Sequence, residues 1–214
     1  MNPTSTYSLI SEVLSRYFDE KLKESPYVLY ERVKDIPRRM RDHARDPEDK
    51  DDDEYGCWKP IPSTVTDKEF RHLERLLRHP LPASYRYFLQ QWHFMELGLD
   101  QHSLLFFPSR PGRLVRGHRG ILKKYYPGEV DRGLLPFANY GDWGVACFDA
   151  RRPAAGNDYP VVLLDHEDGY TNPVSYAANF EDVFRRTSDG FIWIGVGGWV
   201  RDPNLHHDNH SFIH

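Results

Sequence analysis

The stretch that decides the fold runs from Trp-Lys-Pro-Ile-Pro-Ser at residues 58–63 to Leu-Pro-Ala-Ser-Tyr-Arg-Tyr-Phe-Leu at residues 81–89. Between these segments Glu69 follows Thr66 by three residues, which is the spacing of a helix capping box. The apolar residues that follow recur at helical spacing, and two prolines then end the helix. A second helix, with aromatic residues on one face, starts at the second proline or at Ser84. The stretch predicts a helix–break–helix unit, and no arrangement of its residues is typical of a catalytic site.

The sequence beyond residue 98 has the pattern of an antiparallel sheet. Short apolar runs alternate with turn residues such as Asn139-Tyr140-Gly141-Asp142, which favour hairpins. A cap at Asn179 predicts a closing amphipathic helix over 179–187. Helices, a meander and a closing helix predict an α+β fold: a mostly antiparallel sheet flanked by helices, with an N-terminal helical extension. The expected strands are 103–108, 134–138, 143–148 and 159–165, the last pairing with 174–176, and a late strand or buried turn covers 191–200.

Composition divides the chain into four parts. Residues 7–34 have helical spacing, and Pro26 is expected to separate a second helical piece over 27–33. Residues 41–54 hold eight acids and three bases, so this segment carries −5 against a net charge of −4 for the chain. Such a block repels itself, so a solvated linker is favoured and an acidic arm that docks a partner is the alternative. The expected parts are a helical extension over 1–40, the acidic linker over 41–56, a compact domain over 57–200 and a polar, His-rich tail over 201–214.

Composition also indicates a folded chain without a membrane segment. The 214 residues include 5 Trp, 13 Tyr and 12 Phe, whereas a disordered chain would be poor in aromatics. The most apolar run, 191–200, is shorter than the roughly 20 residues that span a bilayer, and no signal-peptide pattern opens the chain. Two cysteines suit a reducing compartment, so the cytoplasm is the expected location. The pI of about 6.2 disfavours a dedicated nucleic-acid binder.

The histidines near the C-terminus resemble a metal site, and the glycines a phosphate-binding loop, only superficially. His206 and His210 would share one face if the tail were helical, as metal-binding histidines do, but the Asn and Asp residues around them favour a disordered polar tail. The glycines of Ile194-Gly-Val-Gly-Gly-Trp199 lack the spacing and the Lys-Ser/Thr of a phosphate loop. Close backbone packing is therefore the favoured interpretation of these glycines, and we expect no metal site.

Two further clusters carry charge. Asp165-His166-Glu167-Asp168-Gly169 holds groups that serve acid–base chemistry, but a β-turn with Gly169 at positive φ is the favoured interpretation. A basic cluster between Arg110 and Lys124 could touch phosphate, yet it is short and lies in an acidic chain, so a solvated face is favoured. Neither Cys57, beside the acidic run, nor Cys147, within a strand, resembles a nucleophile.

Taken in order along the chain, short motifs over roughly residues 57–186 resemble the SUKH superfamily, whose members include bacterial toxin-immunity proteins and a fungal regulator of cell-wall synthesis. Each motif is weak alone, and their shared order makes them specific. After Phe88-Leu89 the family commonly has Asn-Gly, whereas this chain continues Gln-Gln-Trp-His. The matching features are Trp58 with Pro60-Ile61-Pro62; Glu69, Leu73 and Glu74; Leu81-Pro82 with Tyr85 and Phe88-Leu89; Leu135-Pro136-Phe137-Ala138 before Gly141-Asp142; Cys147-Phe148-Asp149; Tyr159-Pro160-Val161; and Asn179-Phe180-Glu181-Asp182.

The resemblance implies an α+β domain that binds a protein and is not an enzyme, without catalytic residues, metal or cofactor. Many bacterial relatives block a polymorphic toxin, often a nuclease, by masking its active site. The positions expected to be structural are Trp58, Pro60, Leu81, Pro82, Tyr85, Phe137, Phe148, Asp149 and Phe180.

Three hypotheses follow, of which a cytoplasmic immunity protein ranks first. Its acidic loops would meet the basic face of a toxin domain, with no direct contact to nucleic acid or membrane. A regulatory scaffold that binds a host protein ranks second, and a metal-assisted hydrolase ranks last. The expected partner-binding residues, on loops beside the sheet, are Asp142, Trp143, Asp165, His166, Glu167 and Asp168.

Overall fold

The centre of the molecule is a five-stranded antiparallel sheet in a computed structural model that describes residues 7–23, 29–47, 54–98, 104–152, 158–188, 191–193 and 199–201. The strands follow one another in space in the order of the chain, as a meander. The predicted pairing of 159–165 with 174–176 is confirmed, as is the α+β class. The strands are β5 (Leu104–Phe106), β6 (Leu134–Tyr140), β7 (Gly144–Asp149), β8 (Val161–Asp165) and β9 (Val174–Ala177).

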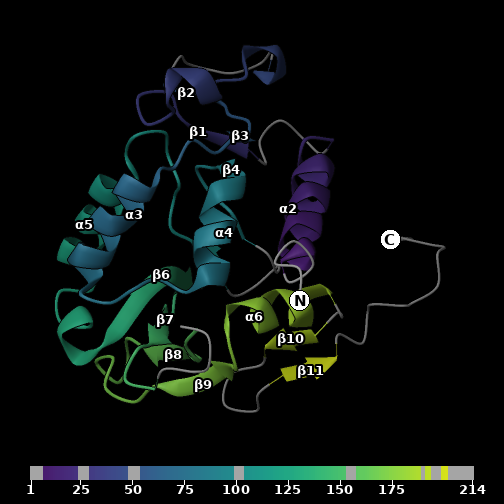
Figure 1. Ribbon diagram of the computed structural model, residues 1–214. Helices are drawn as coiled ribbons and strands as arrows, with labels where there is room; N and C mark the ends of the chain where they lie inside the picture. Colours follow the sequence, from purple (N-terminus) through teal and green to yellow (C-terminus); the bar gives the residue numbers. More distant parts are fainter. Residues whose placement is uncertain are drawn as a thin grey trace.

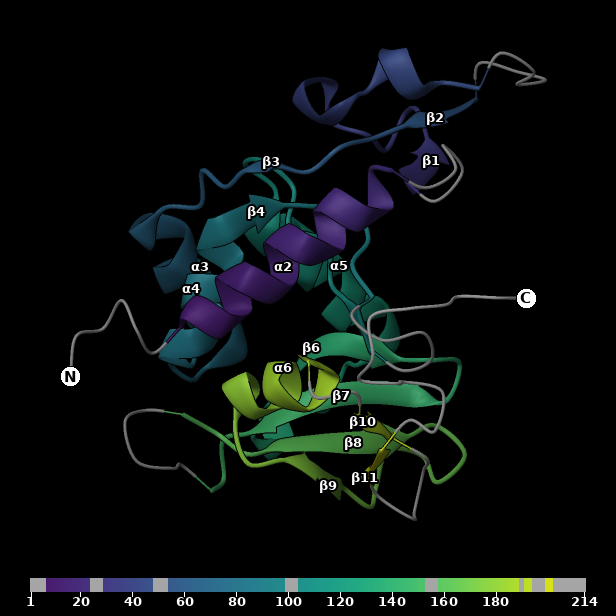
Figure 2. The ribbon, with the colours of Figure 1, turned by 90° about the vertical axis from the view of Figure 1, so that its right-hand side faces the viewer.

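Helices lie on the side of the sheet shown at the top of Figures 1 and 2, and the closing helix packs close to the strands. Both predicted members of the helix–break–helix unit are present, and the predicted closing helix forms with a one-residue offset. The short strands β3 (Ile61–Pro62) and β4 (Trp92–His93) pair across the unit and tie its two ends together. The helices are α2 (Ser8–Lys21), α3 (Asp67–Leu77), α4 (Ala83–Gln91), α5 (Leu114–Tyr125) and α6 (Phe180–Ser188).

The predicted capping box begins α3. The side chain of Thr66 accepts a hydrogen bond from the Glu69 amide, and the Glu69 carboxylate accepts one from the Thr66 amide. Pro82 is the N-cap of α4, where its φ of −52° suits the first turn of a helix. The Glu74 carboxylate accepts hydrogen bonds from the Leu81 amide and the Arg86 guanidinium. These bonds fix the angle between the two helices.

The N-terminal helix is part of the main core. Four side chains of α2, those of Ile10, Val13, Leu14 and Phe18, are buried, and α2 packs on α4 and α6. The second helical piece predicted over 27–33 is wrong, because Tyr30–Arg32 forms strand β1, which pairs with β2 (Tyr55–Cys57). Stacking of the Tyr30 ring on Tyr55 accompanies this pairing, so a tertiary partner overrides the local helical spacing.

The ends of the acidic segment are hydrogen-bonded to the rest of the chain. The 3-10 turns η2 (Arg38–Met40) and η3 (His43–Arg45) lead into Asp46, whose carboxylate accepts a hydrogen bond from the Cys57 amide. Residues 48–53 lie outside the described part of the chain, so the proposed division at 41–56 stays a prediction. Gly195, Gly197, Gly198 and the tail from residue 202 onward also lie outside the described part of the chain. The strands β10 (Phe191–Trp193) and β11 (Trp199–Arg201) lie within it.

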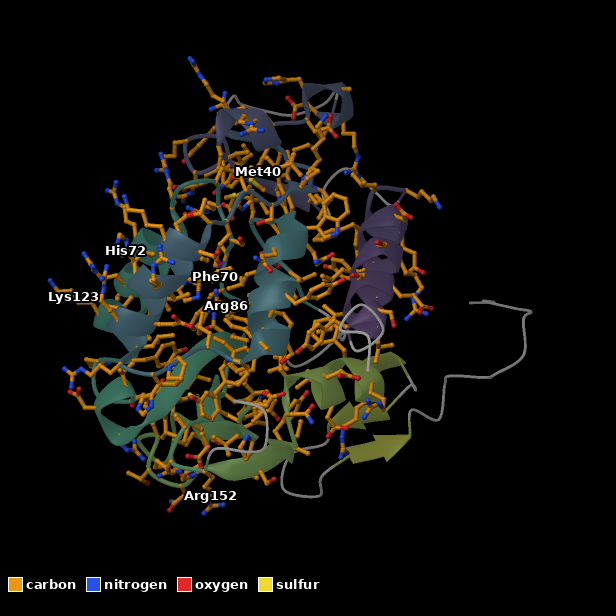
Figure 3. The ribbon with its side chains drawn as sticks, viewed as in Figure 1. Met40, Phe70, His72, Arg86, Lys123 and Arg152 are labelled. Carbon is orange, nitrogen blue, oxygen red and sulfur yellow. The ribbon has the colours of Figure 1, made fainter. Side chains whose placement is uncertain are left out.

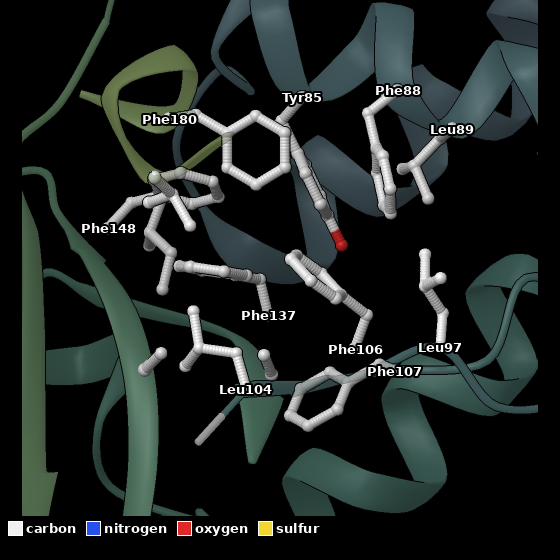
Figure 4. Packing of buried hydrophobic residues seen from close by; sticks show 14 of the residues in the cluster. Tyr85, Phe88, Leu89, Leu97, Leu104, Phe106, Phe107, Phe137, Phe148 and Phe180 are labelled. Atoms are coloured by element: carbon white, nitrogen blue, oxygen red, sulfur yellow. The ribbon is translucent and has the colours of Figure 1, made fainter. Parts of the chain in front are cut away.

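Aromatic rings from α4, α6 and three strands of the sheet meet in the core (Figure 4). Phe180 at the start of α6 is fully buried, and its ring lies 5.1 Å from that of Tyr85, measured between centroids. Phe137 and Phe148, on neighbouring strands, stack at 4.3 Å. The rings of Phe88 and Phe106 complete the cluster around Phe180. This cluster joins α4, α6 and the sheet into one body.

His118, on α5, is a buried titratable group that faces the Tyr85 hydroxyl of this cluster. Its Nδ1–H donates to the Leu114 carbonyl oxygen, which leaves Nε2 as the acceptor facing the Tyr85 hydroxyl at 3.5 Å. Burial lowers the pKa of His118 to about 4. The helix that carries His118 runs for 12 residues, from Leu114 to Tyr125.

The buried imidazole predicts a fold that weakens in mild acid. The unfolded chain takes up the His118 proton near pH 6.5 and the folded chain only near pH 4. Stability is therefore complete above pH 6.5 and falls as the pH drops through this window, by about 2 kcal/mol between pH 7 and pH 5. Urea unfolding of the wild type and His118→Gln at both pH values checks this prediction. The variant should lose most of that difference, and an unchanged difference would exclude His118 as its source.

Candidate functional site

Two turns at one end of the sheet are joined by hydrogen bonds. Trp143 lies in the turn between β6 and β7, and His166 begins the turn between β8 and β9. The His166 amide donates to the Trp143 carbonyl oxygen at 2.8 Å, and the His166 Nδ1–H donates to the same oxygen. All six residues predicted to bind a partner belong to these two turns or to the last residue of β8. The structure brings them together into one surface, here called the turn surface.

Trp143 is the large apolar side chain of the turn surface. Its exposed fraction is 54%, compared with 52% for Tyr125 and 40% for Val174. Its amide donates to the Tyr140 carbonyl oxygen and its carbonyl accepts from His166, so the backbone that carries the indole is fixed on both sides. An exposed indole on a fixed turn loses little conformational entropy when a partner covers it.

Two of the four predicted acids hold the turn itself. The Asp165 carboxylate accepts a hydrogen bond from the Glu167 amide at 2.8 Å. The Asp168 carboxylate accepts from the amides of Thr171 and Asn172. Desolvation alone would raise the pKa of Asp168, but these hydrogen bonds outweigh it and lower the pKa. Asp165 and Asp168 therefore shape the surface.

The other two acids face solvent. Asp142 and Glu167 are exposed, and neither carboxylate has a hydrogen bond or ion pair with another described residue. Asp142 and Glu167 flank Trp143. Asp142 precedes Trp143 in the chain, and Glu167 follows His166, whose amide donates to the Trp143 carbonyl oxygen. The groups of the turn surface that are available to a partner are thus one indole and two carboxylates.

Two features that hold the turn surface cannot be recognised from sequence spacing. The guanidinium of Arg132, in the 3-10 turn η4 (Val130–Arg132), donates to the carbonyl oxygens of Tyr170 and Thr171 at 2.6 and 3.3 Å. Gly144 pairs with Asp165, and a side chain at residue 144 would collide with the Leu164 carbonyl. Both depend on contacts between segments more than 15 residues apart, which local patterns do not record.

The positions expected to be structural lie mostly in the interior. Asp149 is only 1% exposed, and its carboxylate accepts hydrogen bonds from the Arg151 guanidinium at 2.7 and 2.9 Å. These bonds lower the pKa of Asp149 against the opposing effect of burial, so a charged group is held at the end of β7. Pro60 is half-buried. The other positions are buried: Trp58, Leu81, Pro82, Tyr85, Phe137, Phe148 and Phe180.

No constellation for catalysis stands out among the residues that the structure describes. Burial raises the pKa of the Cys147 thiol, which disfavours the reactive thiolate. Cys57 is also buried, and its thiol donates to the Arg45 carbonyl oxygen. Within the described ranges, no group of three His, Cys, Asp or Glu side chains could hold a metal ion. The same ranges contain no helix with both the length and the apolar character needed to cross a bilayer.

A five-stranded meander, a capped helix–break–helix unit and a closing helix that buries Phe180 define an α+β domain with an antiparallel sheet. The model described as SMI1 / KNR4 family (SUKH-1) matches residues 64–186, which is more than half of the 214 residues. The chain belongs to this family. No curated protein matches it.

Proposed function

We propose that this chain is a cytoplasmic immunity protein that neutralises a toxin domain by covering its active site with the turn surface. The observation that carries the proposal is the exposed indole of Trp143, held on a fixed turn between two unpaired carboxylates. Membership of the SUKH-1 family supports the binding of a protein partner. An enzyme that acts on nucleic acid presents a basic cleft, which is the surface that such an acidic patch complements.

Different side chains of the turn surface control the association rate and the dissociation rate. Asp142 and Glu167 attract a basic partner over a distance set by the ionic strength, which raises the association rate. The indole of Trp143 is then buried at the contact and slows dissociation. His166 and Asp165 keep the two turns in register and need not touch the partner.

The first experiment is to tag the full chain, express it in its native host and identify the protein that co-purifies in stoichiometric amount. The captured toxin domain is then titrated with the wild type and with Trp143→Ala/Asp142→Asn/Glu167→Gln. We expect the triple variant to bind at least about 100-fold more weakly, because it removes an aromatic anchor and two charges. A change below about threefold would contradict the proposed surface.

The matched control for this titration is Asp19→Asn/Glu20→Gln on α2. Both residues are exposed, and the variant removes the same two charges far from the turn surface. It should leave the affinity within about twofold of the wild type, since screened surface charges act weakly at a distance. Equal losses in both variants would indicate a nonspecific charge effect.

A regulatory scaffold is the second candidate, because membership of the family supports the binding of a protein partner without specifying which partner. Deleting residues 1–54 does not separate the two functions cleanly, because it removes the buried side chains of α2 from the core. The identity of the captured protein separates them directly. A toxin domain supports immunity, and a housekeeping protein of the cell wall or of signalling supports the scaffold.

A further inference from the structure

The outer face of α5 carries a basic hollow that the turn surface does not include. Its volume is about 560 Å³, which is within the range of small-ligand and side-chain pockets. Four cationic side chains, those of Arg110, Arg113, Arg116 and Lys124, line it. We call it the α5 trough.

The trough exists because α5 lacks side chains at two positions. Gly117 and Gly120 form part of its lining, and a Cβ added at either glycine would meet nothing within 4 Å. A glycine inside a helix costs roughly 1 kcal/mol relative to alanine, and here it leaves the helix backbone open to an approaching chain. Pro108 and Ile121 add apolar lining, and the half-exposed ring of Tyr125 completes it.

Three of the four cations of the trough have no ionic partner in the described part of the chain. Arg113, Arg116 and Lys124 form no ion pair with any residue that the structure describes. The Nε–H of Arg110 is buried and has no hydrogen-bond partner among the residues described, although Asp35 and Glu31 lie near enough to act on its charge. The whole chain has a net charge of −4, so the positive charge of the trough is a local property of this surface.

The positive charge continues beyond the trough onto α3. A second hollow of about 510 Å³ between α3 and α5 is lined by Arg75, Arg78 and Arg119 among others. Arg78 is paired with Asp131, whereas Arg75 and Arg119 have no ion pair among the described residues. Figure 3 shows His72 and Lys123 projecting from these two helices on the same outer side of the molecule.

We propose that the α5 trough binds an acidic peptide segment of a protein partner, with carboxylates on the arginines and one apolar side chain over Gly117 and Gly120. Arginine presents a planar fork that matches a carboxylate in two-point contact. The apolar lining needs an apolar side chain, which an acidic peptide can supply. A single-stranded nucleic acid would stack successive bases on several rings, whereas the trough has one exposed ring, that of Tyr125. Because the α5 trough is basic and the turn surface is acidic, the two surfaces bind partner groups of opposite charge.

The test uses the full chain and three fluorescent probes of 12 units, read by anisotropy. The probes are a peptide of alternating Glu and Leu, its Gln and Leu counterpart, and oligo-dT. We expect the Glu peptide to bind at least about tenfold more tightly than the Gln peptide, with an affinity that falls as salt rises. Arg113→Glu/Arg116→Glu should weaken it at least about tenfold. Both residues lie at the N-terminal end of α5, where glutamate suits the helix dipole, so this variant keeps its fold.

The control variant is Arg16→Glu/Lys23→Glu, which makes the same change of charge at two exposed residues on α2 or just after it, on the opposite side of the molecule from α5 (Figure 1). It should bind the Glu peptide within about twofold of the wild type, because distant surface charges are screened. Equal weakening by both variants, equal binding of the two peptides, or no binding would overturn the proposal. Tighter binding of oligo-dT would assign the trough to nucleic acid instead. These outcomes are independent of the toxin titration, which uses other residues and a partner of opposite charge.

Discussion

Phe180→Ala should destabilise the fold by about 4 kcal/mol, since it removes a large ring from the centre of the core. Phe180 is fully buried, and its ring centroid lies 5.1 Å from that of Tyr85, 5.2 Å from that of Phe184 and 5.4 Å from that of Phe88. The surrounding rings come from α4, α6 and the sheet, so no single element can move to fill the cavity. The loss of stability should therefore include the cost of the cavity as well as the transfer free energy of the removed ring.

Urea unfolding at pH 7 measures this loss, and Tyr125→Ala is the matched control. Tyr125 is an aromatic residue of a helix with a half-exposed ring, so its truncation should cost less than about 1 kcal/mol. A loss below about 1.5 kcal/mol for Phe180→Ala would mean that α6 is not held by the aromatic cluster. The comparison separates burial in the core from the simple removal of an aromatic ring.

The elements that could be predicted from sequence are those fixed by nearby residues. The α3 cap depends on Thr66 and Glu69, which are three residues apart, and the turn at Gly169 depends on one residue that accepts a φ of +66°. β1 could not be predicted, because Tyr30–Arg32 has helical spacing and becomes a strand only through β2, more than 20 residues away. The glycines that open the α5 trough also weaken the helical signal of Leu114–Tyr125.

The turn surface shows the same limit at the level of single residues. Acidic and aromatic residues near turns led to the prediction of its six residues, but their types alone do not say how the side chains are arranged. Asp165 and Glu167 are two residues apart, yet the first accepts a backbone hydrogen bond and the second faces solvent. That distinction depends on the conformation of the turn that follows β8, which His166 joins to the turn that carries Trp143. The two turns meet because β7 and β8 pair in a register that places Gly144 opposite Asp165.

Gly144→Ala should destabilise the fold by about 3 kcal/mol and also disturb the turn surface. An added Cβ at residue 144 would collide with the Leu164 carbonyl oxygen, and would lie 2.9 Å from the Leu164 carbonyl carbon and 3.2 Å from the Asp165 Cα. These atoms belong to the backbone of β8, so a side-chain rotation cannot relieve the clash. Either β8 separates from β7 or the backbone is strained, and overpacking of this kind costs roughly 1–3 kcal/mol or more.

Thermal or urea unfolding of Gly144→Ala and Gly120→Ala measures the effect of the added methyl group. At Gly120, on the open face of α5, nothing lies within 4 Å, so alanine should stabilise the helix by about 0.5–1 kcal/mol. Both variants add the same methyl group. The opposite signs of the two expected stability changes therefore follow from the surroundings of residues 144 and 120. Separation of β8 from β7 would also shift His166 relative to Trp143, so Gly144→Ala should weaken the binding of the proposed partner, although it leaves every side chain of the turn surface unchanged. A Gly144→Ala variant with wild-type stability would mean that β7 and β8 do not approach closely at this residue, and the hydrogen bonds that unite the two turns would lose their structural basis.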